Sequence, residues 1–257
     1  MKRYSIFHPL WLAFYSRDLY ADVGRNWKGL GLTYLLLLLA LCWVPIVVRL
    51  HGGGTSFQKE AEFFIAQVPP ITIRDGELST DVPTPHFIRD DKGETVAIID
   101  LTGKFTSLDE TGAKMLVTKS KVLVRRSRAE TRVYDLSAVK SFSLTQAKMR
   151  DWLHLGVKWF PVIAYPFAVF FSFVYRIIQV FLYGGLGVLF ARSAKVSLDY
   201  QSLVRLAAIA VTPAIILDTI RDLAGWKVQH WWLVCFAVAM AYLFFAVKAN
   251  AERETVS

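Results

Sequence analysis

Apolar and polar residues alternate along this chain on the scale of whole segments. Residues 29–48 contain no charged side chain, and a helix of this length, rising 1.5 Å per residue, crosses a hydrocarbon core of about 30 Å. About a hundred mostly polar residues follow, and a second apolar block extends from Trp159 to Val247. The pattern predicts an integral membrane α-helical bundle of about four spans, with an α+β domain, mainly an antiparallel sheet, inserted after the first span.

The stretch from Trp159 to Ala191 allows two interpretations. It forms either one long, tilted helix or a tight hairpin that spans the membrane twice. With one span, Arg192, Lys195 and Arg205 are cytoplasmic, as basic residues near membrane spans usually are, whereas with two spans they face outward. We therefore expect one span here, a location in the bacterial cytoplasmic (inner) membrane with both termini cytoplasmic, and an extracytoplasmic sheet domain.

These considerations divide the chain into five segments. The predicted segments are a cytoplasmic amphipathic interfacial helix at 1–28, a first transmembrane span at 29–50, an extracytoplasmic sheet domain at 51–156, a membrane bundle at 157–248 with spans of about 160–191, 202–220 and 231–248, and a cytoplasmic tail at 249–257.

The first segment predicts an amphipathic helix before the first span. Trp11, Tyr15, Leu19 and Val23 recur every four residues, which places them on one side of a helix. Such a helix lies either on the membrane surface or against the cytoplasmic face of the bundle itself, and both possibilities stay open. Aromatic and basic side chains favour the membrane interface, and the expected anchors are Trp11, Tyr15, Trp27 and Lys28.

Short apolar runs separated by turn residues predict the sheet domain. Gly52, Gly53 and Gly54 suggest a flexible connector before it, and 57–68 predicts an amphipathic helix that ends before two prolines. The strands are expected at 71–74, 86–89, 95–99, 115–117, 122–124, 131–134 and 141–144.

The charge distribution indicates membrane contacts rather than nucleic-acid binding. The chain is 54% hydrophobic and has a net charge of +9. Residues 51–156 hold 15 basic and 14 acidic side chains, so the excess lies in the membrane-flanking segments, which hold the remaining 15 basic and 7 acidic ones. Flanking basic residues favour contact with anionic lipid headgroups. The expected partners are the lipid bilayer and a membrane protein partner or a second copy of the chain, with no nucleic acid.

Two charges inside the predicted spans require an explanation. Arg176 lies 16 residues before Arg192, and Asp218 lies 16 residues after Ser202. In the four-span arrangement both reach the same height, about 24 Å from the inner face. Because an unpaired charge at that depth is costly, we expect Arg176 and Asp218 to pair inside the bundle. The pair forms either a polar functional site or a purely structural ion pair.

Prolines and glycines in the apolar segments predict kinks and close helix packing. A proline leaves a backbone carbonyl one turn earlier without its donor, and a glycine lets a second helix approach closely. The candidate kink or packing positions are Pro45, Pro166, Pro213, Gly184, Gly185 and Gly187.

The sequence shows no recognisable catalytic arrangement. The five histidines are scattered without metal-ligand spacing, and both cysteines, Cys42 and Cys235, lie in apolar runs. No phosphate-binding glycine loop, zinc-protease motif or nucleophile elbow occurs. We therefore expect no catalytic residue, no cofactor and no metal, and a protein that is not an enzyme.

Several segments together resemble a bacterial membrane family catalogued as domain of unknown function 1189. The resemblance is carried by FYSRDLY at 14–20, IRDGEL at 73–78, IIDLTG at 98–103, LDYQSLVRLA at 198–207 and VTPA at 211–214. The last two segments are also distantly similar to Yip-type membrane proteins, which implies a scaffold or adaptor role. None of these segments is catalytic, so the resemblance identifies a family and implies no chemistry.

Three functional hypotheses follow. The first is a non-enzymatic scaffold, adaptor or sensor whose extracytoplasmic domain binds a partner or envelope ligand. The second is transport or lipid handling, directly or as an accessory subunit, through a polar site at Arg176 and Asp218. The third, a membrane enzyme with an unrecognised site, would require a polar cluster at the membrane interface.

Overall fold

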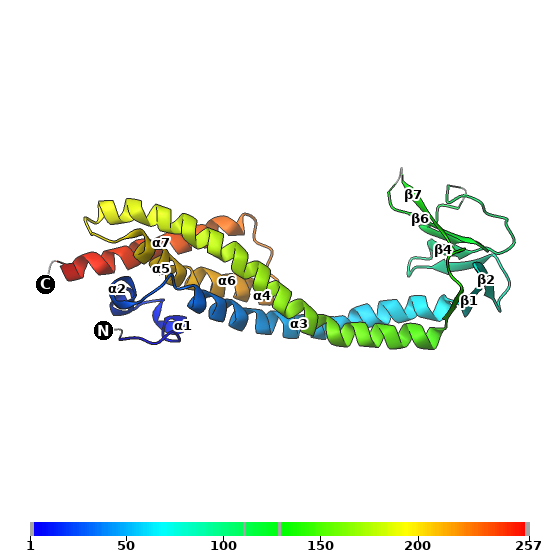
Figure 1. Cartoon of the computed structure of the whole chain (residues 1–257), viewed down its shortest axis with the longest axis horizontal. Coiled ribbons are helices and arrows are strands. Elements are labelled where there is room, and N and C mark those ends of the chain that lie inside the picture. Colours follow the sequence, from blue (N-terminus) through cyan, green and yellow to red (C-terminus); the bar gives the residue numbers. More distant parts are fainter. Residues whose placement is uncertain (1–2, 110, 128–129, 255–257) are drawn as a thin grey trace. The chain divides into compact units, whose positions relative to one another are not determined.

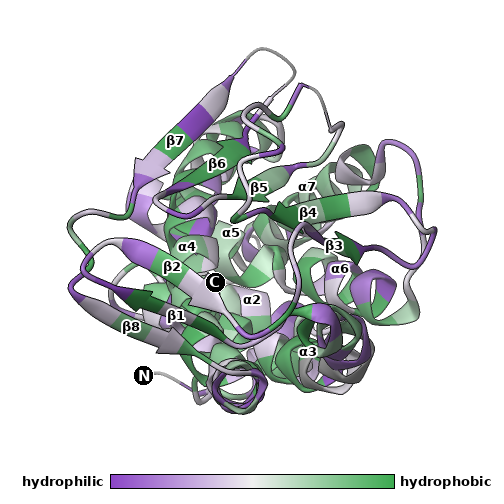
Figure 2. Cartoon of the chain, turned by 90° about the vertical axis from the view of Figure 1, so that its right-hand side faces the viewer, coloured by the Kyte–Doolittle hydropathy of each residue, from purple (hydrophilic) through white to green (hydrophobic). Residues whose placement is uncertain are grey.

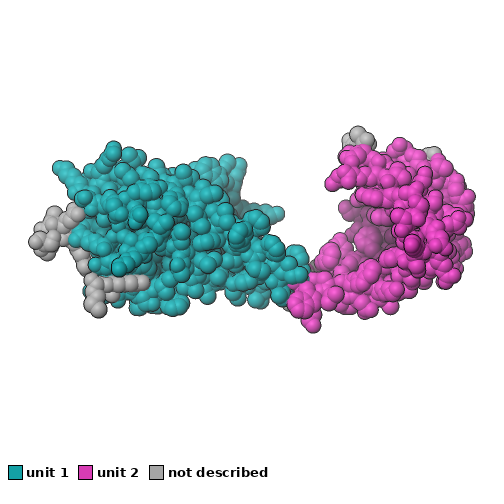
Figure 3. Space-filling model, in the orientation of Figure 1, with its two compact units in different colours: residues 1–52, 160–257 teal, residues 53–159 magenta. Residues whose placement is uncertain are grey.

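The chain folds into two compact units (Figure 3). The computed structural model describes residues 3–109, 111–127 and 130–254. Unit 1 comprises Met1–Gly52 and Phe160–Ser257, and unit 2 comprises Gly53–Trp159. The predicted segments 1–28 and 249–257 extend to residues 1–2 and 255–257, which lie outside the described residues. Each unit has a hydrophobic core of its own, as separate domains do.

Unit 1 is helical, and two of its helices continue into unit 2 (Figure 1). The helices of the chain are α1 (Pro9–Leu12), α2 (Arg17–Asn26), α3 (Leu32–Gln67), α4 (Gln146–Ser193), α5 (Tyr200–Ala210), α6 (Thr212–Ala224) and α7 (Trp231–Glu254). Among the described residues, four stretches are long and apolar enough to cross a membrane: Leu32–Leu50, α4, Tyr200–Ala224 and Trp231–Ala251. Their length and composition suit a membrane-spanning bundle, and in Figure 2 much of the helical ribbon has the colour of hydrophobic residues.

Helix α4 is one uninterrupted helix over the stretch that allowed two interpretations. It runs from Gln146 to Ser193 and contains Pro161 and Pro166 without ending at either. Its most apolar window is only 6% buried inside the protein. Helix α4 therefore presents an apolar surface outward, as a lipid-facing helix does.

The third predicted span, 202–220, is divided in two. Helix α5 ends at Ala210, and α6 begins at Thr212, with Val211 between them. Pro213 is the second residue of α6, where its missing N–H costs least, and its ring disfavours a continuous helix through the preceding turn. The break leaves one candidate span made of two short helices.

The N-terminal segment forms two helices where one was predicted. Ser16 has an extended backbone and its hydroxyl accepts a hydrogen bond from the Leu19 amide, so it caps a new helix, α2. Helix α2 packs against α5 and α7. Its buried residues are Leu19, Tyr20, Ala21, Asp22, Val23 and Gly24. The part of the amphipathic face that lies in α2, Leu19 and Val23, therefore packs on the bundle, which was one of the two arrangements left open, whereas Trp11 and Tyr15 stay exposed.

Unit 2 contains two sheets of short strands. The three-stranded sheet has the order β2-β1-β8, and the five-stranded sheet has the order β3-β4-β5-β6-β7. The strands are β1 (Ile71–Arg74), β2 (Glu77–Thr80), β3 (His86–Arg89), β4 (Thr95–Ile99), β5 (Met115–Val117), β6 (Lys121–Arg125), β7 (Thr131–Asp135) and β8 (Ser141–Leu144).

The strand pairing is mainly antiparallel, as predicted, and two further features were not foreseen. Strands β4 and β5 pair in parallel, with Ile98 opposite Leu116, because the long connection between them returns the chain in the same direction. Strand β2 was not predicted; it pairs with β1 across a two-residue turn. Asp75 and Gly76 in that turn have φ of 48° and 82°, the positive values that tight hairpin turns require.

The predicted glycine connector is part of a helix. Helix α3 continues through Gly52 and Gly53 and ends at Gln67. The Gln67 side chain then pairs with the backbone of β3, accepting from the Arg89 amide and donating to the Arg89 carbonyl, both at 2.9 Å. Gln146, at the start of α4, donates to the Ala66 and Val68 carbonyls. The two bonds from Gln146 satisfy carbonyls at and just after the end of α3, which have no intrahelical donor.

Candidate functional site

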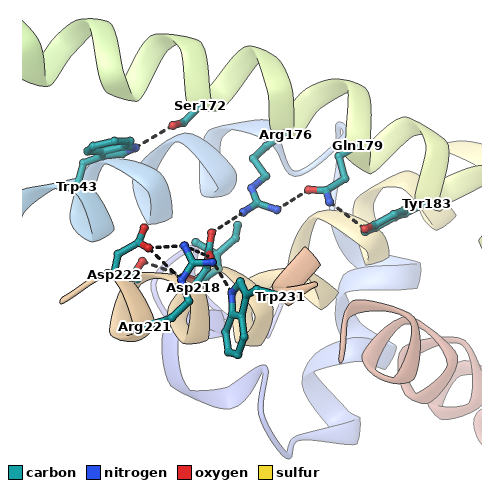
Figure 4. Close-up of polar contacts among 11 residues, drawn as sticks. Trp43, Ser172, Arg176, Gln179, Tyr183, Asp218, Arg221, Asp222 and Trp231 are labelled. Atoms are coloured by element: carbon teal, nitrogen blue, oxygen red, sulfur yellow. Dashed lines mark hydrogen bonds and ion pairs between the residues drawn. The ribbon is translucent and has the colours of Figure 1, made fainter. Parts of the chain in front are cut away.

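Arg176 and Asp218 lie close together inside unit 1. Arg176 projects from α4 toward α6, and its Nη2 is 3.7 Å from Asp218 Oδ2 (Figure 4). Their side chains are 13% and 31% exposed. The distance is longer than a hydrogen bond, so the two groups attract each other as charges without direct proton sharing.

Asp218 has two nearer partners that the sequence analysis missed. Arg221 Nη2 is 3.1 Å from Asp218 Oδ1, and the Trp231 indole donates to the same oxygen at 2.9 Å (Figure 4). Arg221 also binds the carboxylate of its neighbour Asp222. The spacing of three residues between Asp218 and Arg221 was a usable signal, because such residues are neighbours on a helix.

Arg176 is linked to a short chain of polar groups along α4. Its Nη1 donates to Gln179 Oε1 at 2.5 Å, and Gln179 Nε2 donates to the Tyr183 hydroxyl at 2.8 Å (Figure 4). The spacings of three and four residues place the three side chains on one face of α4. Nothing in the sequence motifs marked Gln179 or Tyr183.

A cavity of about 210 Å³ opens beside these charges. It is bordered by α3, α4 and α6, and its lining residues are Leu39, Cys42, Trp43, Ile46, Ser172, Tyr175, Arg176, Ile215, Asp218, Thr219 and Asp222. The Trp43 indole donates to Ser172 Oγ at 2.9 Å and ties α3 to α4 at its edge. A cavity with apolar walls and a few charged groups is the usual form of a small-molecule site.

The charges around the cavity nearly balance. Arg176 and Arg221 face Asp218 and Asp222, and Arg49 donates to the Asp222 carbonyl at 2.6 Å. Within the described part of the chain, no group of three or more His, Cys, Asp or Glu residues is placed to hold a metal ion. The arrangement can bind a small polar or zwitterionic group by ion pairing and hydrogen bonding.

A second polar cluster joins α2, α5 and α7. Arg205 is buried, and its guanidinium donates to the carbonyls of Val23, Gly24 and Gly29 at 2.8–2.9 Å. Asn250 donates to the Tyr20 carbonyl at 3.1 Å. A cation at the carboxyl end of a helix is favourable, because the last carbonyls lack intrahelical donors. Arg205 therefore closes the end of α2.

The candidate glycine and proline positions have different surroundings. A Cβ on Gly184 would lie 2.6 Å from Val204 Cγ2, and one on Gly187 would lie 3.4 Å from Leu203, so both glycines face α5. A Cβ on Gly185 would meet nothing within 4 Å. Pro45 and Pro166 lie inside α3 and α4, and Pro213 follows the break after α5.

The four expected interfacial anchors fall into two groups. Trp11 and Tyr15 are exposed, and so is Lys28. Trp27 is only 6% exposed, and its indole donates to Asp22 at 3.0 Å. Trp27 is thus a core residue of the bundle, where a headgroup cannot reach it.

Asp22 holds the N-terminal segment on α2. Its carboxylate accepts from the backbone amides of Arg3 and Tyr4 at 3.1 Å and from Asn26 at 2.8 Å. Burial alone would raise the pKa of Asp22, but these hydrogen bonds and the one from Trp27 outweigh it and hold the pKa below its usual value. Asp22 is therefore a structural anion.

Unit 2 has a groove of its own, with a volume of about 510 Å³. Its apolar part is formed by Phe63, Phe64 and Val96, and its charged lining residues are Lys59, Glu60, Asp90, Asp91 and Lys114. Phe63 is 47% exposed. The groove combines an apolar surface with charges of both signs, which suits a binding surface and was not predicted.

Comparison with known proteins gives a family and no activity. A protein of Rickettsia prowazekii (strain Madrid E), Uncharacterized protein RP489, is 22% identical over 135 residues, covering 47% of this chain and 46% of the relative. The chain thus spans about half of the length of this curated relative. No solved structure matches the chain. The likeness to Yip-type proteins stays a prediction. Residues 7–247 match the family described as "Protein of unknown function (DUF1189)", and the chain therefore belongs to that family.

Proposed function

We propose that the protein is a non-enzymatic scaffold, adaptor or sensor whose sheet domain binds a partner or envelope ligand outside the cytoplasm. The observation that carries this proposal is the groove of unit 2, with half-exposed Phe63 beside Lys59 and Asp91. An exposed aromatic surface next to charged groups is typical of sites that recognise another molecule.

The orientation belongs to the same proposal. Arg25 Nη2, at the end of α2, donates to the Asn250 carbonyl near the end of α7 at 2.7 Å. The N-terminal segment and the end of the last span therefore lie at the same end of the bundle. Arg25 and Lys28 before the first span and Lys248 in α7 supply basic charge there, which favours the cytoplasmic side of a bacterial inner membrane.

Photocrosslinking in intact cells tests partner binding. A photoreactive phenylalanine analogue replaces Phe63 in the groove, and in a matched control it replaces Tyr134, an exposed aromatic residue on β7 of the same domain. We expect one defined adduct from position 63 and none from position 134. Equal crosslinking at both positions, or a chemical product formed by the purified protein, would contradict the proposal.

Transport or lipid handling is a second candidate, because the ion pair of Arg176 and Asp218 borders a cavity at membrane depth. The four candidate spans among the described residues are few for a transporter, and a second copy packed on the exposed face of α4 would supply more. Combined replacement, Arg176→Gln with Asp218→Asn, removes both charges together. Unchanged lipid or solute flux in proteoliposomes of the double variant would eliminate this candidate.

A further inference from the structure

Arg176 has unused hydrogen-bond donors that open onto the cavity. Within the described chain, its guanidinium makes one hydrogen bond, to Gln179, although the group carries five N–H donors. Each nitrogen of the Arg176 side chain is either accessible or hydrogen-bonded. Arg176 lines the cavity, and its side chain is 13% exposed. A largely buried guanidinium with unused N–H donors favours the binding of an oxyanion such as a phosphate ester.

The opposite side of the cavity offers a free acceptor. Asp222 also lines the cavity and is 47% exposed. Arg221 binds its Oδ1, and within the described chain Oδ2 has no hydrogen-bond partner. A bound anion alone would face the carboxylates of Asp218 and Asp222, and a bound cation alone would face Arg176. A ligand that carries both charges meets both requirements.

Asp222, a charged lining residue of the cavity, lies near the end of a candidate membrane span. Asp222 is two residues before the end of α6, about 3 Å along the helix axis. Arg49, near the end of the apolar part of α3, binds the Asp222 carbonyl. Leu39, Ile46 and other apolar side chains form the rest of the lining, and Tyr175, at 61% exposure, marks where the lining reaches the protein surface. The charged residues of the lining are thus available to the headgroup of a phospholipid, and the apolar residues to its acyl chains.

We propose that this cavity binds a phosphate ester bearing a primary ammonium, the chemistry of the phosphoethanolamine headgroup. Arg176 binds the phosphate oxygens, and Asp222 binds the ammonium. The cavity has a volume of about 210 Å³. The inference rests on the second candidate function, lipid handling, and names its ligand class.

Native mass spectrometry of the full-length protein tests the proposal. The protein is titrated with phosphatidylethanolamine, phosphatidylglycerol and phosphatidylcholine of the same acyl chains, and with soluble O-phosphoethanolamine in a separate arm. We expect the ethanolamine lipid to bind about tenfold more tightly than the other two lipids, because phosphatidylglycerol carries no cation and the quaternary ammonium of phosphatidylcholine has no N–H to donate to Asp222. If O-phosphoethanolamine competes with the lipid, the natural ligand is a soluble compound; if it does not compete, the ligand is the lipid. In both cases the bound group is a phosphate ester with a primary ammonium.

Three variants make the result specific. Arg176→Gln is expected to weaken ethanolamine-lipid binding about tenfold. Asp222→Asn is expected to remove the preference over phosphatidylglycerol. Arg192→Gln, at an exposed arginine in the last turn of α4, is the matched control and is expected to bind as the unmodified protein does. Unchanged thermal unfolding midpoints show that the variants are folded.

Two results would overturn the proposal: equal binding of the three lipids, or unchanged ethanolamine-lipid binding by Arg176→Gln. Flux measurements on the same samples separate this inference from the function on which it rests. Selective binding without any flux eliminates transport and leaves the ligand class standing. Flux that depends on Arg176 without headgroup preference eliminates the ligand class and leaves transport standing.

Discussion

The Asn250 side chain on α7 packs directly on Gly24 of α2. A Cβ on Gly24 would lie 2.9 Å from Asn250 Cγ, closer than real Cβ atoms approach such a neighbour, and nearer still to Oδ1. Asn250 cannot move away easily, because its Nδ2 donates to the carbonyls of Tyr20 and Ala246. The close contact between α2 and α7 therefore requires a glycine at this position.

Gly24→Ala is expected to destabilise the bundle by about 1–3 kcal/mol, because the added methyl overlaps Asn250. Unfolding by sodium dodecyl sulfate in mixed micelles measures the change. Asn250→Ala removes the obstacle, so the double variant is expected to lose less stability than the sum of the two single changes. Strictly additive losses would show that the contact is not the cause.

Two neighbouring glycines in α4 provide a matched pair. Gly184→Ala is expected to cost about 1–3 kcal/mol, because the new Cβ would lie 2.6 Å from Val204 Cγ2 and 3.2 Å from Val204 Cα, a backbone atom that cannot rotate away. Gly185→Ala meets open space and is expected to be neutral or slightly stabilising. The same titration compares them, and equal effects would contradict the packing of α4 on α5.

Arg205→Met is expected to destabilise unit 1 by about 3 kcal/mol or more. Methionine keeps much of the side-chain length but removes the donors to the carbonyls of Val23, Gly24 and Gly29, of which the Gly24 carbonyl keeps its bond from the Ser202 hydroxyl. In the Arg205→Met variant, the rate of amide hydrogen exchange in α2 should rise under conditions in which the rest of the protein stays folded. Arg192→Met, at an exposed arginine, is the control and should leave α2 unchanged.

Asp100 is expected to make the sheet domain sensitive to acid. Burial alone would raise the pKa of Asp100, but hydrogen bonds from the Thr102 hydroxyl and the Phe105 and Thr102 amides hold it below its usual value. Because the folded pKa is lowered, this stabilisation is complete above the unfolded pKa of about 3.9 and is lost as the pH falls through the folded pKa.

Hydrogen exchange of residues 97–105 between pH 7 and pH 3, corrected for intrinsic rates, checks this expectation. The unmodified protein should lose protection below about pH 4. Asp100→Asn should be less protected at neutral pH and should change less on acidification. A constant difference between the two proteins down to pH 3 would contradict the assignment to Asp100.

Local patterns predicted most of the secondary structure. All seven expected strand positions match strands closely, because alternating β-branched residues between turn residues are a local signal. Strand β2 was missed, since Glu77 and Ser79 give it little apolar character. The parallel pairing of β4 and β5 depends on where a long connection leads, which local patterns do not record.

Of the charged residues at the candidate site, the sequence analysis predicted only two. Arg176 and Asp218 stand out because they interrupt apolar spans. Arg221 and Asp222 lie closer to the end of their span and resemble ordinary flanking charges, although they complete the cluster. Trp27 was expected at the membrane surface, but its place is decided by Asp22, a partner that no spacing rule identifies.

The outward surface of α4 has a consequence for how this sequence changes over evolutionary time. Only 6% of its most apolar window is buried within the protein, so few positions there are packed against other parts of the described chain. Selection at such positions acts on hydrophobicity and hardly on shape, whereas Gly184 meets one defined contact. Homologous chains should therefore exchange leucine, valine and phenylalanine freely along α4 while retaining a small residue at position 184.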